Sequence, residues 1–145
     1  MALPSKLLLE IVTPDRSLVR EEVDEVVVPG AEGELGILPG HTPLLATLKV
    51  GELWYRQGST KHSLAVAFGF VEVLPERVTV LASVAERPED IDTARAERAK
   101  RRAEERLASP TASNKESGVD FERARIAMMK SLIRLQVASR VRTRA

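Results

Sequence analysis

The stretch that decides the fold runs from Thr60 to Ala82 and reads TKHSLAVAFGFVEVLPERVTVLA. Valine, leucine and threonine dominate its β-rich runs, and the turn dipeptide Pro75-Glu76 separates two of them. Similar runs recur upstream at a spacing of roughly 8–12 residues, which is typical of a β-sandwich or barrel. We expect strands at Lys6–Thr13, Val23–Val28, Glu34–Leu38, Glu52–Gln57, Thr60–Ala67, Phe70–Leu74 and Arg77–Ala82.

Charge and composition divide the 145 residues near residue 87. Residues 1–86 have a net charge of −5 and hold seven of the eight glycines, whereas residues 87–145 have a net charge of +6. Such a division indicates two kinds of structure in one chain. We predict an N-terminal antiparallel β-sandwich over residues 1–86 and an antiparallel two-helix hairpin over residues 87–145.

The second part has the signals of two helices. Pro88 suits a first helical position, and the acidic residues after it favour a helix N-terminus. The segment up to Leu107 is rich in strong helix formers, and residues 108–118 form a polar loop. Ser117 and Asp120 have capping-box spacing and open a second helix that continues to about Ser139.

The second helix has two apolar stripes, and a hairpin needs only one. The alanines of the first helix can cover one of them, so the other must pack on the sandwich or on a partner protein. One stripe holds Phe121, Ala124, Met128, Leu132 and Leu135, and the other holds Ile126, Met129, Ile133 and Val137.

Composition excludes several function classes. There are no cysteines and only two histidines, so thiolate chemistry and a histidine-based metal site are not expected. Because no nucleophile–base pair stands out either, we expect no independent enzymatic activity and no required cofactor. The sequence holds no run of the ~20 apolar residues that span a membrane, so we expect a soluble chain that meets a membrane only through a partner.

Two glycine-containing loops of the first part are candidate docking sites. Residues 30–36 read GAEGELG, which is not a phosphate-binding motif and predicts a tight, exposed acidic loop. Residues 38–41 read LPGH and fit a type II turn with Gly40 at the position that needs a positive φ. His41 is either a base or, as we favour, a structural or interface histidine.

The hairpin holds a candidate anion site. Asp92, Arg95 and Ala96 share one helix face, and a hairpin that turns near residue 113 places Asp92 level with Arg134 and Ala96 level with Lys130. Cations grouped in this way suit the phosphates of a nucleotide. The alternative is a set of salt bridges between the helices.

The end of the second helix is strongly basic, with Arg134, Arg140, Arg142 and Arg144 and no acidic residue after Glu122. A basic helix of this kind binds nucleic acid, anionic lipid or an acidic protein surface, unless it is a solvated tail. A nucleic-acid-binding module is therefore the alternative function, although the five aromatic residues offer little for base stacking.

The order of these features resembles the epsilon subunit of bacterial F-type ATP synthase, and the similarity covers nearly the whole chain. The resemblance rests on Gly30–Leu45 (GAEGELGILPGHTPLL), on residues 68–73 (FGFVEV), on residues 78–82 (VTVLA) and on residues 90–96 (DIDTARA). It implies a non-catalytic subunit of the rotating central stalk, with the gamma subunit, the ring of c subunits and the beta and alpha subunits of the catalytic head as partners and no nucleic acid. It also implies a peripheral location on the cytoplasmic face of the bacterial plasma membrane.

The resemblance further implies roles for individual residues. The loop Glu32, Gly33, Glu34 and Leu35 would dock on the c ring, and His41 would lie near gamma. The hairpin would switch between a folded and an extended state and oppose ATP hydrolysis when extended, with Arg134, Arg140 and Arg142 meeting the beta subunit. A regulatory ATP would be held by Glu86, Asp92, Arg95, Ala96, Arg134 and Lys130, the last standing where an arginine is common in the family.

Overall fold

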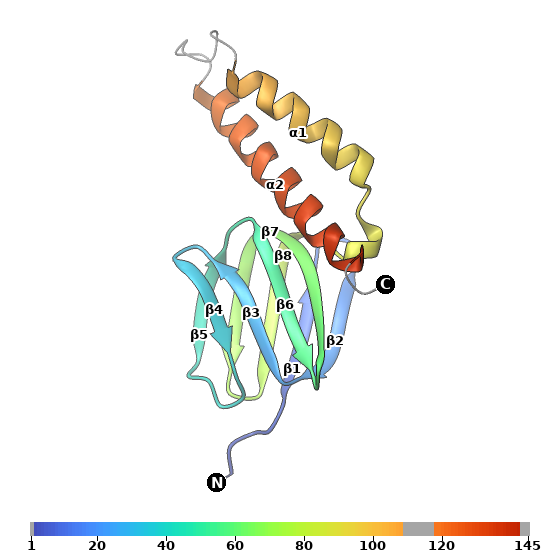
Figure 1. Ribbon diagram of the computed structural model, residues 1–145. Helices are drawn as coiled ribbons and strands as arrows, with labels where there is room; N and C mark the ends of the chain where they lie inside the picture. Colours follow the sequence, from blue (N-terminus) through green and yellow to red (C-terminus); the bar gives the residue numbers. More distant parts are fainter. Residues whose placement is uncertain (1, 109–117, 143–145) are drawn as a thin grey trace. The chain divides into compact units, whose positions relative to one another are not determined.

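The computed structural model describes residues 2–108 and 118–142 (Figure 1). The chain divides into two compact units, Met1–Glu86 and Arg87–Ala145. The first unit is built from strands and the second from helices, and each is described by itself.

The first unit is a β-sandwich of eight strands around one core. Its sheet follows the order β2-β1-β8-β7-β5-β3-β4, and β6 pairs with both β3 and β7. The pairing is antiparallel except between β1 and β8, which run parallel, so the predicted sandwich is confirmed with this one difference. The strands are β1 Leu7–Val12, β2 Ser17–Val23, β3 Glu25–Gly30, β4 Gly33–Ile37, β5 Leu44–Leu48, β6 Gly51–Gln57, β7 Thr60–Leu74 and β8 Arg77–Glu86.

Strands β2 and β5 were absent from the prediction. β2 contains three consecutive charged residues, and only Val19 and Val23 of this strand are buried. β5 is short and follows a proline-containing loop, and only Leu48 of this strand is buried. Neither strand has the dense β-branched pattern that marks the central strands, because each places few side chains in the core.

Strand β7 is one bent strand where the sequence predicted two. Its first part pairs with β6 and its second part with β5. The bend falls at Phe68 and Gly69, which have φ angles of 61° and 114°. A Cβ atom on Gly69 would lie 1.9 Å from the carbonyl oxygen of Leu81, so only glycine fits at this position.

The core is filled by alternate side chains from almost every strand. Leu9 and Ile11 of β1 and Val71 and Val73 of β7 are fully buried, as the period-two spacing of strands requires. Burial of large aliphatic side chains at this density makes the sandwich the better-packed unit of the chain.

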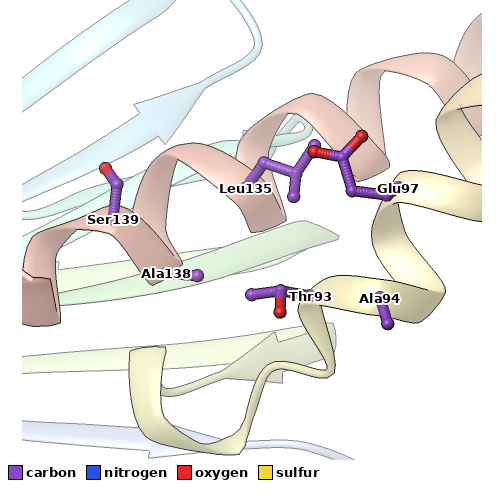
Figure 2. A pocket seen from close by; sticks show the side chains of 6 residues that line it. All are labelled: Thr93, Ala94, Glu97, Leu135, Ala138 and Ser139. Atoms are coloured by element: carbon purple, nitrogen blue, oxygen red, sulfur yellow. The ribbon is translucent and has the colours of Figure 1, made fainter.

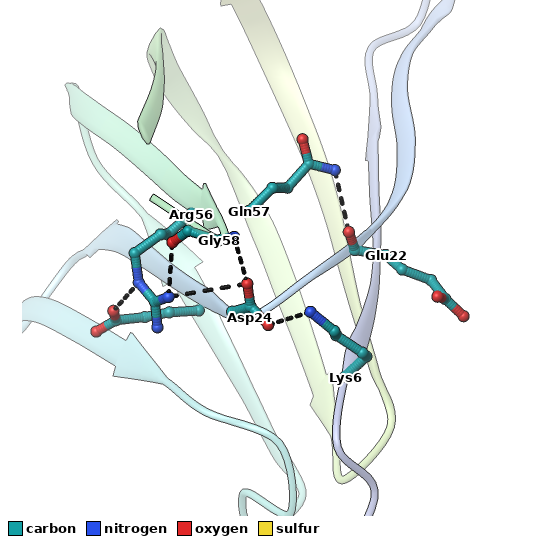
Figure 3. Close-up of polar contacts among 7 residues, drawn as sticks. Lys6, Glu22, Asp24, Arg56, Gln57 and Gly58 are labelled. Carbon is teal, nitrogen blue, oxygen red and sulfur yellow. Dashed lines mark hydrogen bonds and ion pairs between the residues drawn. The ribbon is translucent and has the colours of Figure 1, made fainter. Parts of the chain in front are cut away.

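A polar network around Asp24 joins three segments at one end of the sandwich (Figure 3). Lys6 donates a hydrogen bond to Asp24 Oδ1, and the backbone N–H of Gly58 donates one to Oδ2 over 2.6 Å. Arg56 donates to Glu25 and to the carbonyl of Gly58, at 3.4 and 3.0 Å. The bonds from Lys6 and Gly58 hold the pKa of Asp24 below its usual value. The network ties the N-terminal segment and the β6–β7 turn to the β2–β3 connection.

The second unit begins with a short 3₁₀ helix, η1 (Pro88–Asp90), and continues with α1 (Thr93–Ala108) and α2 (Gly118–Arg142). The prediction that Pro88 opens the first long helix is wrong, because Ile91 is extended and ends η1. Asp92 instead caps α1: its Oδ1 accepts the backbone N–H of Arg95 over 3.0 Å. Residues 109–117 of the predicted loop lie outside the described residues. They include Ser117, the first residue of the predicted capping box.

Helices α1 and α2 pack against each other through small residues. Ala96 and Ala103 of α1 and Ala124 and Ser131 of α2 are buried, and each pair is spaced by seven residues. Ser131 satisfies its hydroxyl by donating to the carbonyl of Met128 over 2.8 Å. The larger residues of both predicted stripes, except Val137, are only partly buried or exposed, because the small residues occupy the centre of the contact. Over the part of the chain that the structure describes, no helix is long and apolar enough to cross a membrane.

Candidate functional site

The acidic loop of the first unit is a tight turn between β3 and β4. Gly30 and Gly33 are cross-strand partners, so only Ala31 and Glu32 lie between the two strands. Gly33 has a φ of 134°, and the side chains of Glu32 and Glu34 are exposed. Leu35 is half-buried and packs against the core. The predicted tight acidic loop is therefore confirmed, and its two carboxylates are accessible to a partner.

His41 closes the turn that the sequence predicted at residues 38–41. Its backbone N–H donates to the carbonyl of Leu38 over 3.2 Å, and Gly40 has the expected positive φ of 85°. The ring nitrogen Nδ1 of His41 lies 2.7 Å from the carbonyl of Thr42 and donates to it. This local bond orients the half-buried imidazole within the turn, and the structural or interface role of His41 stays a prediction.

An exposed apolar face on β5, β7 and β8 is a feature that the sequence analysis missed. Phe70 and Leu81 are direct cross-strand partners, and Leu45 lies diagonally from Phe70 on the same side. Their exposed fractions are 51%, 53% and 69%, which is unusual for three large neighbouring apolar side chains. The alternation in FGFVEV could have located Phe70 on the outer side, but Leu45 required the unpredicted strand β5.

The hairpin has a cavity of about 330 Å³ between α1 and α2. It is lined by Thr93, Ala94 and Glu97 of α1 and by Leu135, Ala138 and Ser139 of α2 (Figure 2). The predicted level pairs, Asp92 with Arg134 and Ala96 with Lys130, stay a prediction.

Four cations of the hairpin lie on one side of the small-residue contact. At 100° per residue, Arg98 and Arg102 of α1 and Lys130 and Arg134 of α2 fall on the side opposite to the one that holds Glu97. Arg98 and Arg102 are exposed, and Lys130 and Arg134 are half-buried. We call this set the cationic face.

The residues of the predicted nucleotide site are distributed over both units. Glu86 is the last residue of β8, in the first unit. Asp92 already uses one carboxylate oxygen to cap α1, and Ala96 is buried in the helix contact where we expected it to leave space for a ligand. Arg95 is exposed one turn before Arg98. Arg140 is exposed, and the side chain of Arg142 lies outside those described.

Within residues 2–108 and 118–142, no group of three histidine, aspartate or glutamate side chains could hold a metal ion. What the arrangement provides is a set of surfaces: an acidic loop, an apolar face, a cationic face and a groove between two helices. These surfaces and the join of a small β-sandwich to a helical hairpin define a binding subunit with two structural parts.

Comparisons with known proteins identify the family. The family model for the β-sandwich domain of the ATP synthase delta/epsilon chain matches residues 6–88, and the model for its long α-helix domain matches residues 89–139. The chain belongs to the ATP synthase delta/epsilon chain family.

Relatives and solved structures agree with this membership. ATP synthase epsilon chain 2 of Syntrophotalea carbinolica is 49% identical over 135 residues, covering 93% of this chain and 95% of that one. The ATP synthase epsilon chain of Desulforamulus reducens is 50% identical over 130 residues, covering 90% and 95%. A chain in the mitochondrial ATP synthase of Euglena gracilis has the same fold, with a TM-score of 0.75 at 24% identity over 91% of this chain and 82% of that one.

Proposed function

We propose that this chain is a subunit of the rotating central stalk of an F-type ATP synthase, coupling rotation of the c ring through the gamma subunit to ATP synthesis. The observation that carries the proposal is the apolar face of Leu45, Phe70 and Leu81. A rotor element needs a partner that grips it permanently, and permanent interfaces bury apolar and aromatic side chains. We assign this face to gamma.

The acidic loop supplies a second contact. Glu32 lies in the two-residue turn and Glu34 follows it in β4, and both are exposed, so they suit polar contacts with the loops of the c ring. Gly33 and Leu35 follow the same turn in β4. His41 ends the neighbouring turn at residues 38–41, and we assign this histidine to the contact with gamma. Through these partners the chain would sit peripherally at the cytoplasmic face of the bacterial plasma membrane.

The hairpin is the regulatory element of the proposal. A small-residue contact lets α1 and α2 stay paired with little large apolar surface between them, which suits an element that must change its partners. When extended, the hairpin would oppose ATP hydrolysis through contacts of Arg134, Arg140 and Arg142 with the beta subunit in the catalytic head of alpha and beta subunits. The chain itself would carry out no catalysis.

A regulatory ATP would hold the hairpin in one state. The cationic face supports this part, because Arg98, Arg102, Lys130 and Arg134 all fall on one side of the contact between the two helices. Arginine forms bidentate bonds to phosphate, and Arg95 extends the set toward the start of α1. ATP bound to only one state shifts the switch by the difference in its two affinities.

The gamma contact is tested by placing a charge on the apolar face. Phe70→Asp should abolish copurification with gamma and ATP-driven proton pumping of the reconstituted enzyme, because a carboxylate would be buried at the interface. Thr60→Asp changes an exposed residue of the same strand, outside the face, and should leave both intact. Equal copurification of the two variants would refute the assignment.

The nucleotide site is tested by a titration of the full chain with ATP, followed by NMR. Arg98→Ala should weaken binding at least about tenfold, as expected for loss of a charged phosphate contact. Lys100→Ala removes a cation from the other side of α1, where Lys100 pairs with Glu104, and serves as the control. Equal effects of the two variants, or no shifts at millimolar ATP, would refute the site and leave the stalk role standing.

A further inference from the structure

The side of the hairpin opposite to the cationic face has a groove with one apolar and one acidic wall. On α2, Phe121, Leu132 and Leu135 fall on this side at 100° per residue, and the first two are 43% and 45% exposed. On α1, Glu97 and Glu104 fall on the same side, and Lys100 lies between them and the helix contact. The cavity described above, which holds Glu97 and Leu135 together, lies in this groove (Figure 2).

The charge in the groove is concentrated at Glu97. Glu104 lies 3.9 Å from Lys100 and forms an ion pair with it. Among the described residues, Glu97 makes no ion pair and no side-chain hydrogen bond. An exposed carboxylate at the mouth of a cavity therefore carries the net negative charge of this side of the hairpin.

The cavity fits an amphipathic cation. Leu135, Ala138 and Ala94 provide apolar lining for a hydrocarbon stem, while Glu97, which lies beside Leu135 in Figure 2, provides the acceptor for a cationic head. Lysine and arginine are the side chains that combine such a stem with such a head. A volume of about 330 Å³ is at the small end of ligand cavities, as expected for a site that takes one side chain.

We propose that this groove binds an amphipathic helix of a partner protein, which places one lysine or arginine in the cavity at Glu97 and its apolar side chains on Leu132 and Phe121. Leu132 and Leu135 are three residues apart and Phe121 lies about three turns before Leu132, so a helix whose apolar residues recur every three to four positions can contact all of them. The acidic wall selects a helix with a positive flank and repels one with a negative flank. This surface is distinct from the apolar face of the sandwich and from the cationic face of the hairpin.

The full chain can be tested with a synthetic amphipathic helical peptide that carries leucines at i, i+3, i+4 and i+7 and one lysine beside them. Binding is followed by fluorescence anisotropy of the labelled peptide. Leu132→Ser should weaken it about tenfold or more through loss of an apolar anchor, and Glu97→Gln about fivefold through loss of the ion pair. Glu105→Gln changes an exposed glutamate that points away from α2 at 100° per residue, so it is the matched control and should change nothing.

A second peptide, with glutamine in place of the lysine, isolates the charge contact. It should bind about fivefold more weakly to the unaltered chain and equally to the Glu97→Gln variant. The proposal is overturned if the first peptide does not bind, if Glu97→Gln and Glu105→Gln act alike, or if sedimentation shows that a second copy of the chain fills the groove instead. None of these results depends on gamma binding or on ATP.

Discussion

The two units of the chain are packed with different kinds of side chain. The sandwich buries leucine, isoleucine and valine from nearly every strand in one core. The hairpin joins its helices through Ala96, Ala103, Ala124 and Ser131 and leaves Leu132 and Phe121 largely exposed. Since buried apolar area is the main source of stability, the sandwich should be the rigid unit and the hairpin the unit that unfolds or rearranges first.

The largest expected effect comes from the bend in β7. Gly69→Ala puts a methyl group against the backbone of Leu81 at a φ that other residues rarely adopt, so we expect a loss of at least about 3 kcal/mol in the free energy of unfolding. The fluorescence of Trp54, the only tryptophan, reports on the sandwich during urea unfolding. Gly36→Ala is the control, because nothing lies within 4 Å of the added atom. Equal stability of the two variants would contradict the strain at the bend.

The next largest effect is the loss of unfolding free energy when a buried leucine of the sandwich is truncated, compared with an exposed leucine of the hairpin. Leu53→Ala leaves a cavity in the core and should lower the free energy of unfolding by about 2–4 kcal/mol, measured by Trp54 fluorescence. Leu132→Ala removes the same atoms from a side chain that is partly in water and should cost less than about 1 kcal/mol, measured by circular dichroism. Similar costs at the two positions would contradict the difference in packing.

The contact between α1 and α2 is tested by placing a larger side chain in it. Ala103→Leu forces a bulky side chain into the small-residue contact and should destabilise the hairpin by about 1–3 kcal/mol. The helical circular dichroism should melt at a lower temperature while Trp54 fluorescence keeps its transition. Ala127→Leu, at an exposed position of α2, is the control. Loss of both signals together in Ala103→Leu would show that the units do not unfold separately.

The smallest effect is the pH dependence at Asp24. Its pKa is lowered in the folded chain, so its contribution to stability is complete above the ordinary value of 3.8 and is lost as the pH falls from there through the folded pKa. Urea unfolding monitored by Trp54 should lose stability over this acid range. Asp24→Asn should flatten that decline, and Lys6→Gln should move it to higher pH. An unchanged profile in both variants would exclude Asp24 as the cause.

The sequence predicts the class of each unit well, because the relevant signals are local. Val78 and Val80 of β8 alternate with exposed or half-buried neighbours, and α1 is built from strong helix formers, so strands and helices could be assigned from period and propensity. The turn at Gly40 was likewise predictable, since a positive φ there leaves few alternatives to glycine.

What the sequence could not supply depends on contacts between distant residues. Strand β2 forms because it pairs with β1. Its run of charged residues gives no alternating apolar pattern from which a strand could be predicted. The cationic face depends on which sides of α1 and α2 pack against each other, and the structure reveals this through the buried Ala96, Ala103, Ala124 and Ser131. The apolar face needed strand β5, whose partner β7 lies more than 20 residues away.

Hydrogen exchange of the full chain, followed residue by residue, tests the contrast between the two units most directly. Amides of Val71, Val73 and Val80 in the sandwich should exchange only through global unfolding, whereas those beside Ala103 and Ser131 should exchange through a separate opening of lower free energy. Adding urea should leave the hairpin rates nearly unchanged while it accelerates those of the core strands. Equal protection and equal urea dependence in both units would contradict a rigid sandwich joined to a separable hairpin.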